Sequence, residues 1–310
     1  MLTRVKKIIK PIITRYRINK QLRSLVNPLY IDGFPESKNF GDALNIFLVN
    51  FLSSRSVFAS RFLSCTPEKN KTSYAVIGSV CQLSRRQSVI WGAGFIDEQF
   101  KQVPFVHPAK VLAVRGPLSR AVYLENGIDC PACYGDPALL LPIIYDTPVE
   151  VTYDYGIIPH YVDWDSAWVN QYRNRKDVLI INIMIKDDYV LFVKQLKSCR
   201  RIVSSSLHGM ILAHAYHIPV CAVKLSEEVQ GGDFKFNDYL LSIGKQPIQR
   251  TNPQTSQLSI HVLDYDDEPI SLDLTPLIAS CPFINHEQKQ QLMLQSESYY
   301  GKMGGERWDK

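Results

Sequence analysis

Short apolar runs alternate with helix-like segments along most of the chain. In the first half, the apolar runs lie at 29–31, 74–78, 88–92 and 111–115. Leu44, Leu48 and Phe51 repeat at helical spacing after the first run, and Pro117 opens a second helix-like segment. Apolar strands that end in glycine are typical of parallel sheets with helices on both faces. The pattern predicts a doubly wound α/β domain over residues 28–147.

The alternation pauses at 142–153, a proline-containing stretch that indicates a linker, and then begins again. The second group of strand-like runs lies at 156–162, 178–184, 201–205 and 219–224. Helix-like segments separate them, and a late helix is predicted over 287–297. We therefore expect a second Rossmann-like domain over 148–310 that ends in a C-terminal helix. Two such domains would place a ligand in the cleft between them, opposite the carboxyl ends of the strands.

The composition is that of a globular protein, and its charge is unevenly distributed. The 310 residues are 45% hydrophobic and 21% charged, which excludes a disordered chain or a small disulfide scaffold. Eight of the 35 Lys and Arg residues lie in 1–31, where there is no acid. The rest of the chain is therefore slightly acidic, and we expect no nucleic acid as a partner.

The basic N-terminal segment, residues 1–27, is also patterned as a helix. Val5, Ile8, Ile12 and Tyr16 lie on one apolar stripe, and basic residues occupy most other positions. A cationic amphipathic helix of this kind suits an anionic membrane surface, so peripheral contact through residues 1–25 is one interpretation. The other is a helix packed on its own domain with a solvated basic face.

The chain carries no pattern of a secretory signal or of a membrane-spanning helix. The chain has seven cysteines, and an odd number is typical of reduced thiols. We therefore expect a cytoplasmic protein, which would bind peripherally to the inner face of the cytoplasmic membrane if residues 1–25 contact it. Cys130 and Cys133 have redox-motif spacing but no second pair, and no metal site is predicted.

Polar clusters follow several strand-like runs, where the ends of parallel strands place ligand-binding side chains. Asn39 or Asp42 would cap the helix after the first run, or Asp42 would act as a general base for a hydroxyl. Arg115 would bind a carboxylate or phosphate, or form a surface ion pair. Asp136 precedes a proline and favours a turn. Gly94 would let a ligand approach the backbone.

The segment 204–209, Ser-Ser-Ser-Leu-His-Gly, is the strongest of these clusters. Hydroxyl groups and free backbone N–H groups at a helix N-terminus form an anion site. His208 would lie in the first helical turn, where it could donate a proton or bind a phosphate. A structural role is the common alternative for a single histidine.

Eight strings of the chain, in this order, resemble the polysaccharide pyruvyl transferase family, in its bacterial exopolysaccharide and lipopolysaccharide branch. The strings are NFGDAL at 39–44, VIGS at 76–79, VIWGAGFI at 89–96, VRGPLSR at 114–120, YGDPALLLP at 134–142, IIPHYVD at 157–163, SSSLHG at 204–209 and FKFNDYLLSIG at 234–244. The resemblance implies two Rossmann-like domains arranged as in GT-B glycosyltransferases. It also implies transfer of the pyruvyl group of phosphoenolpyruvate to two hydroxyls of one sugar, which forms a cyclic ketal and releases phosphate. No cofactor is implied.

The resemblance matches Arg115 and the Leu207-His208 pair to the family's donor site. The other roles are our hypotheses, and a packed structural histidine remains the alternative for His160. His208 would be the acid that protonates phosphoenolpyruvate, and Asp42 the base. The donor side would lie mainly in the second domain, with Ser205, Ser206, Leu207, Gly209 and Lys235. Arg115 of the first domain would also belong to it. The acceptor side or cleft would comprise Asn39, Gly94, Asp136 and His160. The family's Arg-Leu-His triplet reads Ser206-Leu207-His208 here, so a bidentate anion contact is missing. Lys235, Lys224 or the backbone N–H groups near Ser205 and His208 would replace it.

Two other functions remain open from the sequence. A GT-B glycosyltransferase would share the fold and would bind a nucleotide sugar. A non-catalytic scaffold would bind a glycan or membrane without turnover. The acceptor would be a glycan or a lipid-linked oligosaccharide, and the sequence indicates neither the sugar nor the oligomeric state.

Overall fold

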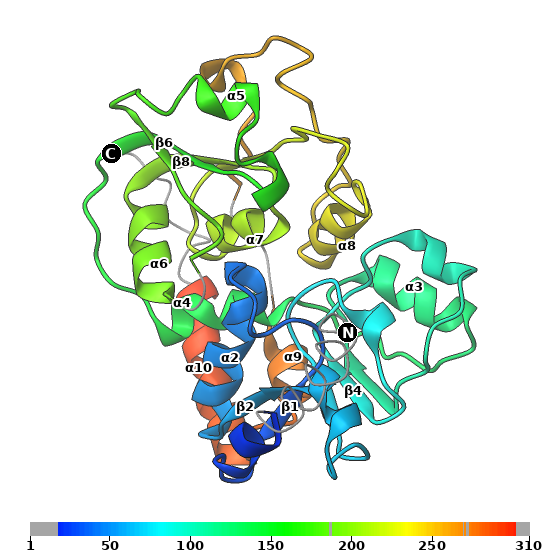
Figure 1. The fold of residues 1–310 in the computed structure, drawn as a ribbon. Helices are drawn as coiled ribbons and strands as arrows, with labels where there is room; N and C mark the ends of the chain where they lie inside the picture. The colour runs from blue at the N-terminus through cyan, green and yellow to red at the C-terminus, as the bar shows by residue number, and fades with distance from the viewer. Residues whose placement is uncertain (1–17, 186–187, 269, 271–272, 302–310) are drawn as a thin grey trace, which may run out of the picture.

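A computed structural model describes residues 18–185, 188–268, 270 and 273–301 (Figure 1). Residues 1–17 lie outside this range and include the whole predicted amphipathic stripe, so the structure does not test it and membrane contact stays a prediction. Among the described residues, no helix has the length and apolar character needed to span a bilayer.

The first half of the chain forms a parallel five-stranded sheet. Its strands are β1 (Leu29–Ile31), β2 (Val57–Ala59), β3 (Ser73–Ala75), β4 (Ser88–Trp91) and β5 (Lys110–Ala113), in the order β2-β1-β3-β4-β5. Its helices are α2 (Phe40–Ser53), α3 (Pro117–Glu125) and α4 (Leu141–Ile144), with 3-10 turns η1 (Ser60–Cys65), η2 (Cys81–Leu83), η3 (Glu98–Lys101) and η4 (Pro137–Leu140).

The second half forms a parallel four-stranded sheet. Its strands are β6 (Tyr153–Ile158), β7 (Val178–Ile180), β8 (Cys199–Ser204) and β9 (Val220–Ala222), in the order β7-β6-β8-β9. Its helices and 3-10 turns are η5 (Tyr161–Asp163), α5 (Ala167–Asn170), α6 (Tyr189–Lys197), α7 (Leu207–Ala215), α8 (Phe234–Ser242) and η6 (Ile260–Val262).

The two sheets share one topology. In each, the first strand lies between the second and the third, so the direction of the chain crossover reverses there. Ligands in doubly wound proteins bind at this switch point, beside the carboxyl ends of the strands. The relevant edges are those of β1 and β3 in the first sheet and of β6 and β8 in the second.

The structure confirms the predicted α/β class with parallel sheets. The GT-B-like arrangement across a cleft and the domain boundaries stay predictions. Several predicted strands end early. Strand β6 stops at Ile158 because Pro159 has no N–H group to continue the ladder, and β3, β7 and β9 stop at Ala75, Ile180 and Ala222. Lys235, assigned to the donor side, lies in the first turn of α8.

The C-terminal helices α9 (Thr275–Ala279) and α10 (His286–Gly301) return to the first half of the molecule (Figure 1). Trp91 donates its indole N–H to the carbonyl of Leu277 at 2.8 Å, and the Tyr300 hydroxyl donates to the carbonyl of Leu139 at 2.6 Å. The late helix was predicted, but its apolar positions do not indicate which sheet it covers.

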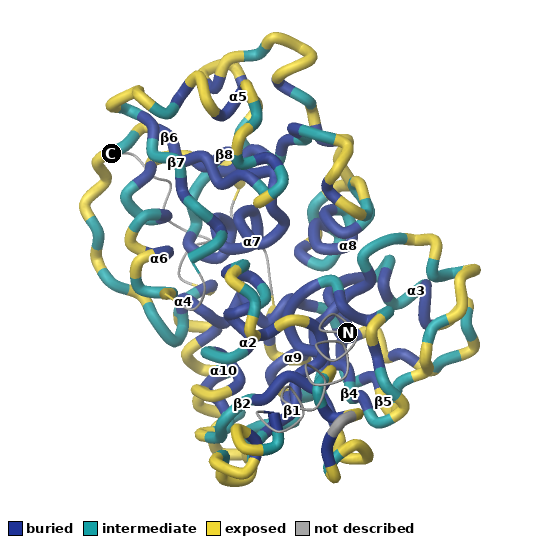
Figure 2. Tube along the Cα trace, viewed as in Figure 1, coloured by how far each residue is buried: buried dark blue, intermediate teal, exposed yellow. Residues whose placement is uncertain are grey.

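The two halves are in direct contact. The Phe40 N–H donates to the carbonyl of Ile183 at 2.8 Å, and the Phe40 ring stacks on Phe192 at 4.3 Å. Helix α8 of the second half packs against α3 of the first. Figure 2 shows that the strands β6 and β8 and helix α7 are largely buried.

Candidate active site

The candidate site is built around the ends of β6 and β8, at the switch point of the second sheet. The His160 N–H donates to the Ser205 Oγ at 2.8 Å, which joins the two strand ends. The Ser205 hydroxyl in turn donates to the Asp163 carboxylate at 2.6 Å. These bonds fix the backbone next to the start of α7.

The serines before α7 turn the chain from strand into helix. The Ser204 Oγ accepts from the Ser206 N–H at 3.0 Å and donates to backbone carbonyls. Leu207 and His208 begin the helix, where the first N–H groups have no partner within the helix and the helix dipole is positive. A Cβ at Gly209 would overlap the Ser204 Oγ, so Gly209 allows α7 to approach the sheet.

His208 faces a carboxyl group of the first half. Its Nε2 lies 3.9 Å from the Asp136 Oδ2, and neither atom has a hydrogen-bond partner among the described residues. The other edge of the ring lies against Gly41, where a Cβ would overlap the imidazole. Burial lowers the pKa of His208 to about 3, and the charges of Arg115 and Lys235 act in the same direction. The imidazole is therefore neutral near neutral pH.

Asp136 has two distinct carboxyl oxygens. The Oδ1 accepts from the Ala138 N–H at 3.0 Å and caps the turn η4, as its position before Pro137 predicted. The Oδ2 faces His208. Burial raises the pKa of Asp136 to about 7, against the effect of Arg115. Near neutral pH this carboxyl group can therefore hold a proton next to the neutral imidazole.

Asp42 lies in the first turn of α2, directly after Gly41. Asn39 caps this helix, because its Oδ1 accepts from the Gly41 N–H at 3.0 Å. Burial raises the pKa of Asp42 to about 6, although a hydrogen bond with Ser37 opposes the shift. Gly41, the residue before Asp42, packs against His208, while the Asp42 carboxyl group lies near Gly78.

Arg115 is fully buried and bonded to protein groups. It donates from Nε to Asp238 at 3.0 Å, from Nη1 to the Ser79 hydroxyl at 2.7 Å and from Nη2 to the Phe95 carbonyl at 2.7 Å. The predicted surface ion pair is thus a buried one that joins the segment after β5 to α8. Gly94 packs on the guanidinium, since a Cβ there would lie 2.5 Å from Cζ. Direct contact of Arg115 with a donor stays a prediction.

Lys235 is a buried cation without a carboxylate partner among the described residues. Its Nζ donates to the carbonyl of Gln230 at 2.8 Å. Burial lowers its pKa to about 8, and Arg250 and Arg115 act in the same direction. Lys224, the other predicted replacement, is already paired with Glu227 at 2.7 Å.

His160 belongs to the same group of basic side chains. Burial lowers its pKa to about 4, with a further contribution from the charge of Lys235. Lys235 also lowers the pKa of His208. The charge of Lys235 therefore disfavours the charged form of both histidines, and a bound anion would favour the charged form of all three side chains.

Arg250 is a member of this group that the sequence did not indicate. It is buried, its Cζ lies 3.8 Å above the Phe236 ring, and its Nε donates to Asp233 at 2.6 Å. A parallel bridge between Val223 and Thr251 brings it to the site. A single arginine in a loop-rich segment carries no periodic signal, so only the fold reveals it.

The described residues give no support for thiol or metal chemistry. Burial raises the pKa of Cys130 to about 12, which disfavours its thiolate. No cluster of His, Cys, Asp and Glu among the described residues could hold a metal ion.

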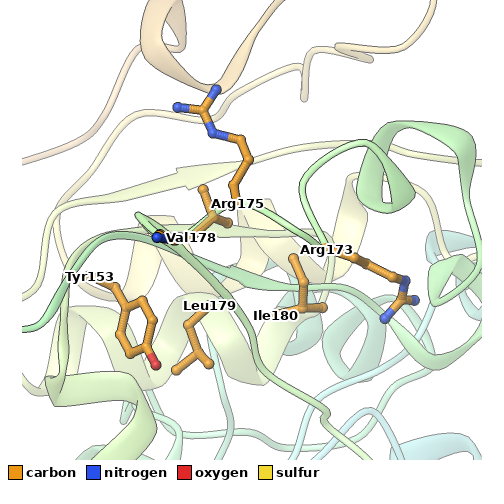
Figure 3. Close-up of a pocket in the computed structure, with 7 residues that line it drawn as sticks. Tyr153, Arg173, Arg175, Val178, Leu179 and Ile180 are labelled. Carbon is orange, nitrogen blue, oxygen red and sulfur yellow. The ribbon is translucent and has the colours of Figure 1, made fainter.

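A pocket of about 560 Å³ opens at the edge strand β7 (Figure 3). Its lining is Tyr153, Arg173, Arg175, Lys176, Val178, Leu179 and Ile180. Arg175 is held by Asp177 at 2.7 Å, and Arg173 donates to Asn170 at 2.7 Å. None of the predicted site residues lines this pocket.

The fold and site define a doubly wound α/β protein with buried basic side chains at the switch point of its second sheet. Comparison with known proteins identifies its family. Residues 39–227 match the family model described as "Polysaccharide pyruvyl transferase", and the chain belongs to this family. The resemblance recognised from the sequence is thereby confirmed.

Two curated proteins are similar to the chain. Uncharacterized protein L143 of Acanthamoeba polyphaga mimivirus is 32% identical over 233 residues, which cover 70% of this chain and 75% of that protein. Succinoglycan biosynthesis protein ExoV of Rhizobium meliloti (strain 1021) is 26% identical over 215 residues, which cover 66% of this chain and 62% of that protein. No solved structure matches the chain.

Proposed function

We propose that the protein transfers the pyruvyl group of phosphoenolpyruvate to two hydroxyls of one sugar in a surface polysaccharide or its precursor. The product is a cyclic ketal, and phosphate is released. The observation that carries this proposal is the group of buried bases at the start of α7, in which Lys235 has no carboxylate partner among the described residues. Membership of the family supports the same chemistry.

The donor carries a carboxylate and a phosphate, and the site offers complementary groups. Lys235 provides a charged ammonium, and the first turn of α7 provides N–H groups at the positive end of a helix. Arg250 and Arg115 add positive potential although their donors are bonded to protein groups. This set would compensate for Ser206, where the family has an arginine.

Binding of the donor would also activate His208. Burial and the neighbouring positive charges hold its pKa low in the free protein. A bound dianion offsets those charges and favours the imidazolium. Asp136, whose raised pKa keeps a proton within reach, would act as the positioning residue that supplies this proton to Nε2 and holds the ring.

The proposed reaction then has two steps, in which every proton is accounted for. His208 donates its proton to the methylene carbon of phosphoenolpyruvate, and the adjacent carbon becomes electrophilic. A sugar hydroxyl attacks that carbon, and its proton passes to Asp42. The second hydroxyl attacks the same carbon as the C–O bond to phosphate breaks, and its proton leaves with the phosphate. The proton on Asp42 returns to the His208–Asp136 pair through solvent.

The acceptor is proposed as a glycan or lipid-linked oligosaccharide. The name of the similar Rhizobium protein concerns biosynthesis of the polysaccharide succinoglycan, which supports a polysaccharide acceptor. A cytoplasmic location with membrane contact through residues 1–25 would bring the protein to lipid-linked units, and the eight basic residues in 1–31 support this part of the proposal.

A thermal-shift comparison tests the donor class. Phosphoenolpyruvate should raise the unfolding temperature of the full chain, whereas nucleoside diphosphates and nucleotide sugars should not. Stabilisation by a nucleotide sugar alone would support the glycosyltransferase alternative. Stabilisation by glycans and by neither donor class would support a scaffold, and both results would contradict the proposal.

A further inference from the structure

Tyr161 lies at the same strand ends as the candidate donor site. It directly follows His160, whose N–H is bonded to Ser205 at the switch point. It is the first residue of η5, and the last residue of that turn, Asp163, accepts from the Ser205 hydroxyl. The position of Tyr161 is therefore fixed by the bonds that also fix the start of α7.

Tyr161 is open to solvent, whereas His160 and Val162 are half-buried and Asp163 is buried. Tyr161 is 52% exposed, and its ring packs on the His160 ring at 4.4 Å with a tilt of 34°. His160 therefore supports one side of the ring, and the remainder is accessible. A rigid, supported aromatic ring of this kind can receive a flat ligand with little loss of conformational entropy.

Two other exposed rings in the described structure differ from Tyr161. Phe34 is 45% exposed, but the guanidinium of Arg61 lies 5.0 Å from its centroid. Phe51 is 53% exposed and lies in the last turn of α2, about 15 Å along the helix from Gly41 at 1.5 Å per residue. Single exposed apolar residues are common, so location is what distinguishes Tyr161.

The chemistry of the ring selects among the ligands of such a site. The face of an aromatic ring is electron-rich, which disfavours contact with phosphate or carboxylate. A pyranose ring presents polarised C–H groups on one face, which pack favourably on an aromatic face. Lys235 and the start of α7 suit the anionic donor, and the Tyr161 ring suits a neutral sugar.

We propose that Tyr161 is the stacking platform for the hexopyranose ring of the acceptor. This inference rests on the proposed function and extends it to the acceptor. The sugar would lie on the open part of the ring, beside the strand ends that place His160 and the start of α7. Tyr161 would thus determine affinity for the acceptor and have no part in binding phosphoenolpyruvate.

Saturation-transfer NMR with the full chain tests the platform. The probes are methyl β-D-glucopyranoside and methyl β-D-galactopyranoside, and the variants are Tyr161→Ala, Tyr161→Phe and Phe51→Ala. At least one hexoside should bind the unaltered protein through its C–H protons. Tyr161→Ala should raise its Kd about tenfold, in keeping with the loss of one ring contact. Tyr161→Phe retains the ring and should bind within about twofold of the unaltered protein.

Phe51→Ala is the matched control, because it removes an equally exposed ring from another part of the surface. Its hexoside affinity should be unchanged. The inference is contradicted if neither hexoside binds the unaltered protein, if Tyr161→Ala binds as the unaltered protein does, or if Phe51→Ala weakens binding equally. Stabilisation by phosphoenolpyruvate should persist in Tyr161→Ala. If phosphoenolpyruvate does not stabilise the unaltered protein while hexosides bind it, the proposed function is contradicted and the stacking role of Tyr161 is not.

Discussion

The Nε2 of His208 and the Oδ2 of Asp136 face each other at 3.9 Å across the junction of the two halves, and neither atom has a hydrogen-bond partner among the described residues. Burial moves the two pKa values in opposite directions, down for the imidazole and up for the carboxyl. The pair can therefore hold one proton, which the free protein keeps on Asp136. A bound anion would move that proton to His208, where the proposed chemistry needs it.

Asp136→Asn tests this positioning role. The amide retains an oxygen that can cap η4, so the fold should persist. The variant cannot share a proton with His208, and kcat should fall about 100-fold, within the usual range for acid–base catalysis. The unaltered enzyme should lose kcat/KM as the pH rises above about 7, where the pair loses its proton. The loss of kcat/KM above about pH 7 should be absent from the Asp136→Asn variant. An unchanged pH profile would show that Asp136 only caps the turn.

The proposed role of Asp42 as a base predicts a loss of activity at low pH. A base must be deprotonated to accept the hydroxyl proton, and burial raises the pKa of Asp42 to about 6. The value of kcat/KM for the acceptor should therefore fall as the pH drops below about 6. Asp42→Asn should lower the rate at pH 7 by about 10²–10⁴ and remove this pH dependence. An Asp42→Asn variant with the full rate at pH 7 would exclude the base role.

Lys235 should control the affinity for phosphoenolpyruvate. Because burial lowers its pKa to about 8, binding measured by calorimetry should weaken as the pH rises above that value and the ammonium loses its charge. Lys235→Met should weaken binding at pH 7 by about tenfold or more, the effect of losing one charge-assisted contact. Lys224→Met is the control, since Lys224 is paired with Glu227. Equal effects of the two substitutions would argue against a specific contact.

The Arg115–Asp238 pair should stabilise the junction of the two halves. Both side chains are fully buried, and Asp238 also accepts from the Ser119 N–H and hydroxyl. Asp238→Ala leaves the guanidinium buried and unpaired, so the free energy of unfolding in urea should fall by about 3–5 kcal/mol.

Asp154→Ala provides the comparison for this loss. It removes an exposed ion pair with Arg200 and should change the free energy of unfolding by less than about 1 kcal/mol. A loss of that small size for Asp238→Ala would mean that water reaches Arg115.

The sequence predicted the parts of the site that depend on local order along the chain. The segment 204–209 was expected to join a strand to a helix, and it does so at the end of β8. The caps formed by Asn39 and Asp136 also follow from neighbouring residues. Local pattern decides such features because they involve backbone groups only a few residues away.

Contacts between distant segments could not be predicted in this way. Neither the approach of Asp136 to His208 nor the burial of Arg115 against Asp238 has a signal in the spacing of residues. Arg250 enters through the loop after β9, and α10 returns to the first half. Each depends on which surfaces pack together, which a hydrophobic pattern leaves open.

The most direct test of pyruvyl transfer uses phosphoenolpyruvate labelled with ¹³C at its methylene carbon. The full chain would be incubated with this donor and with methyl hexosides or succinoglycan oligosaccharides, and ¹³C NMR and phosphate release would be followed together. We expect a new ketal methyl signal that grows in proportion to phosphate, and the loss of both in a His208→Ala variant that stays folded. Phosphate release without the ketal signal, no reaction with any acceptor, or full activity of His208→Ala would contradict the proposed function.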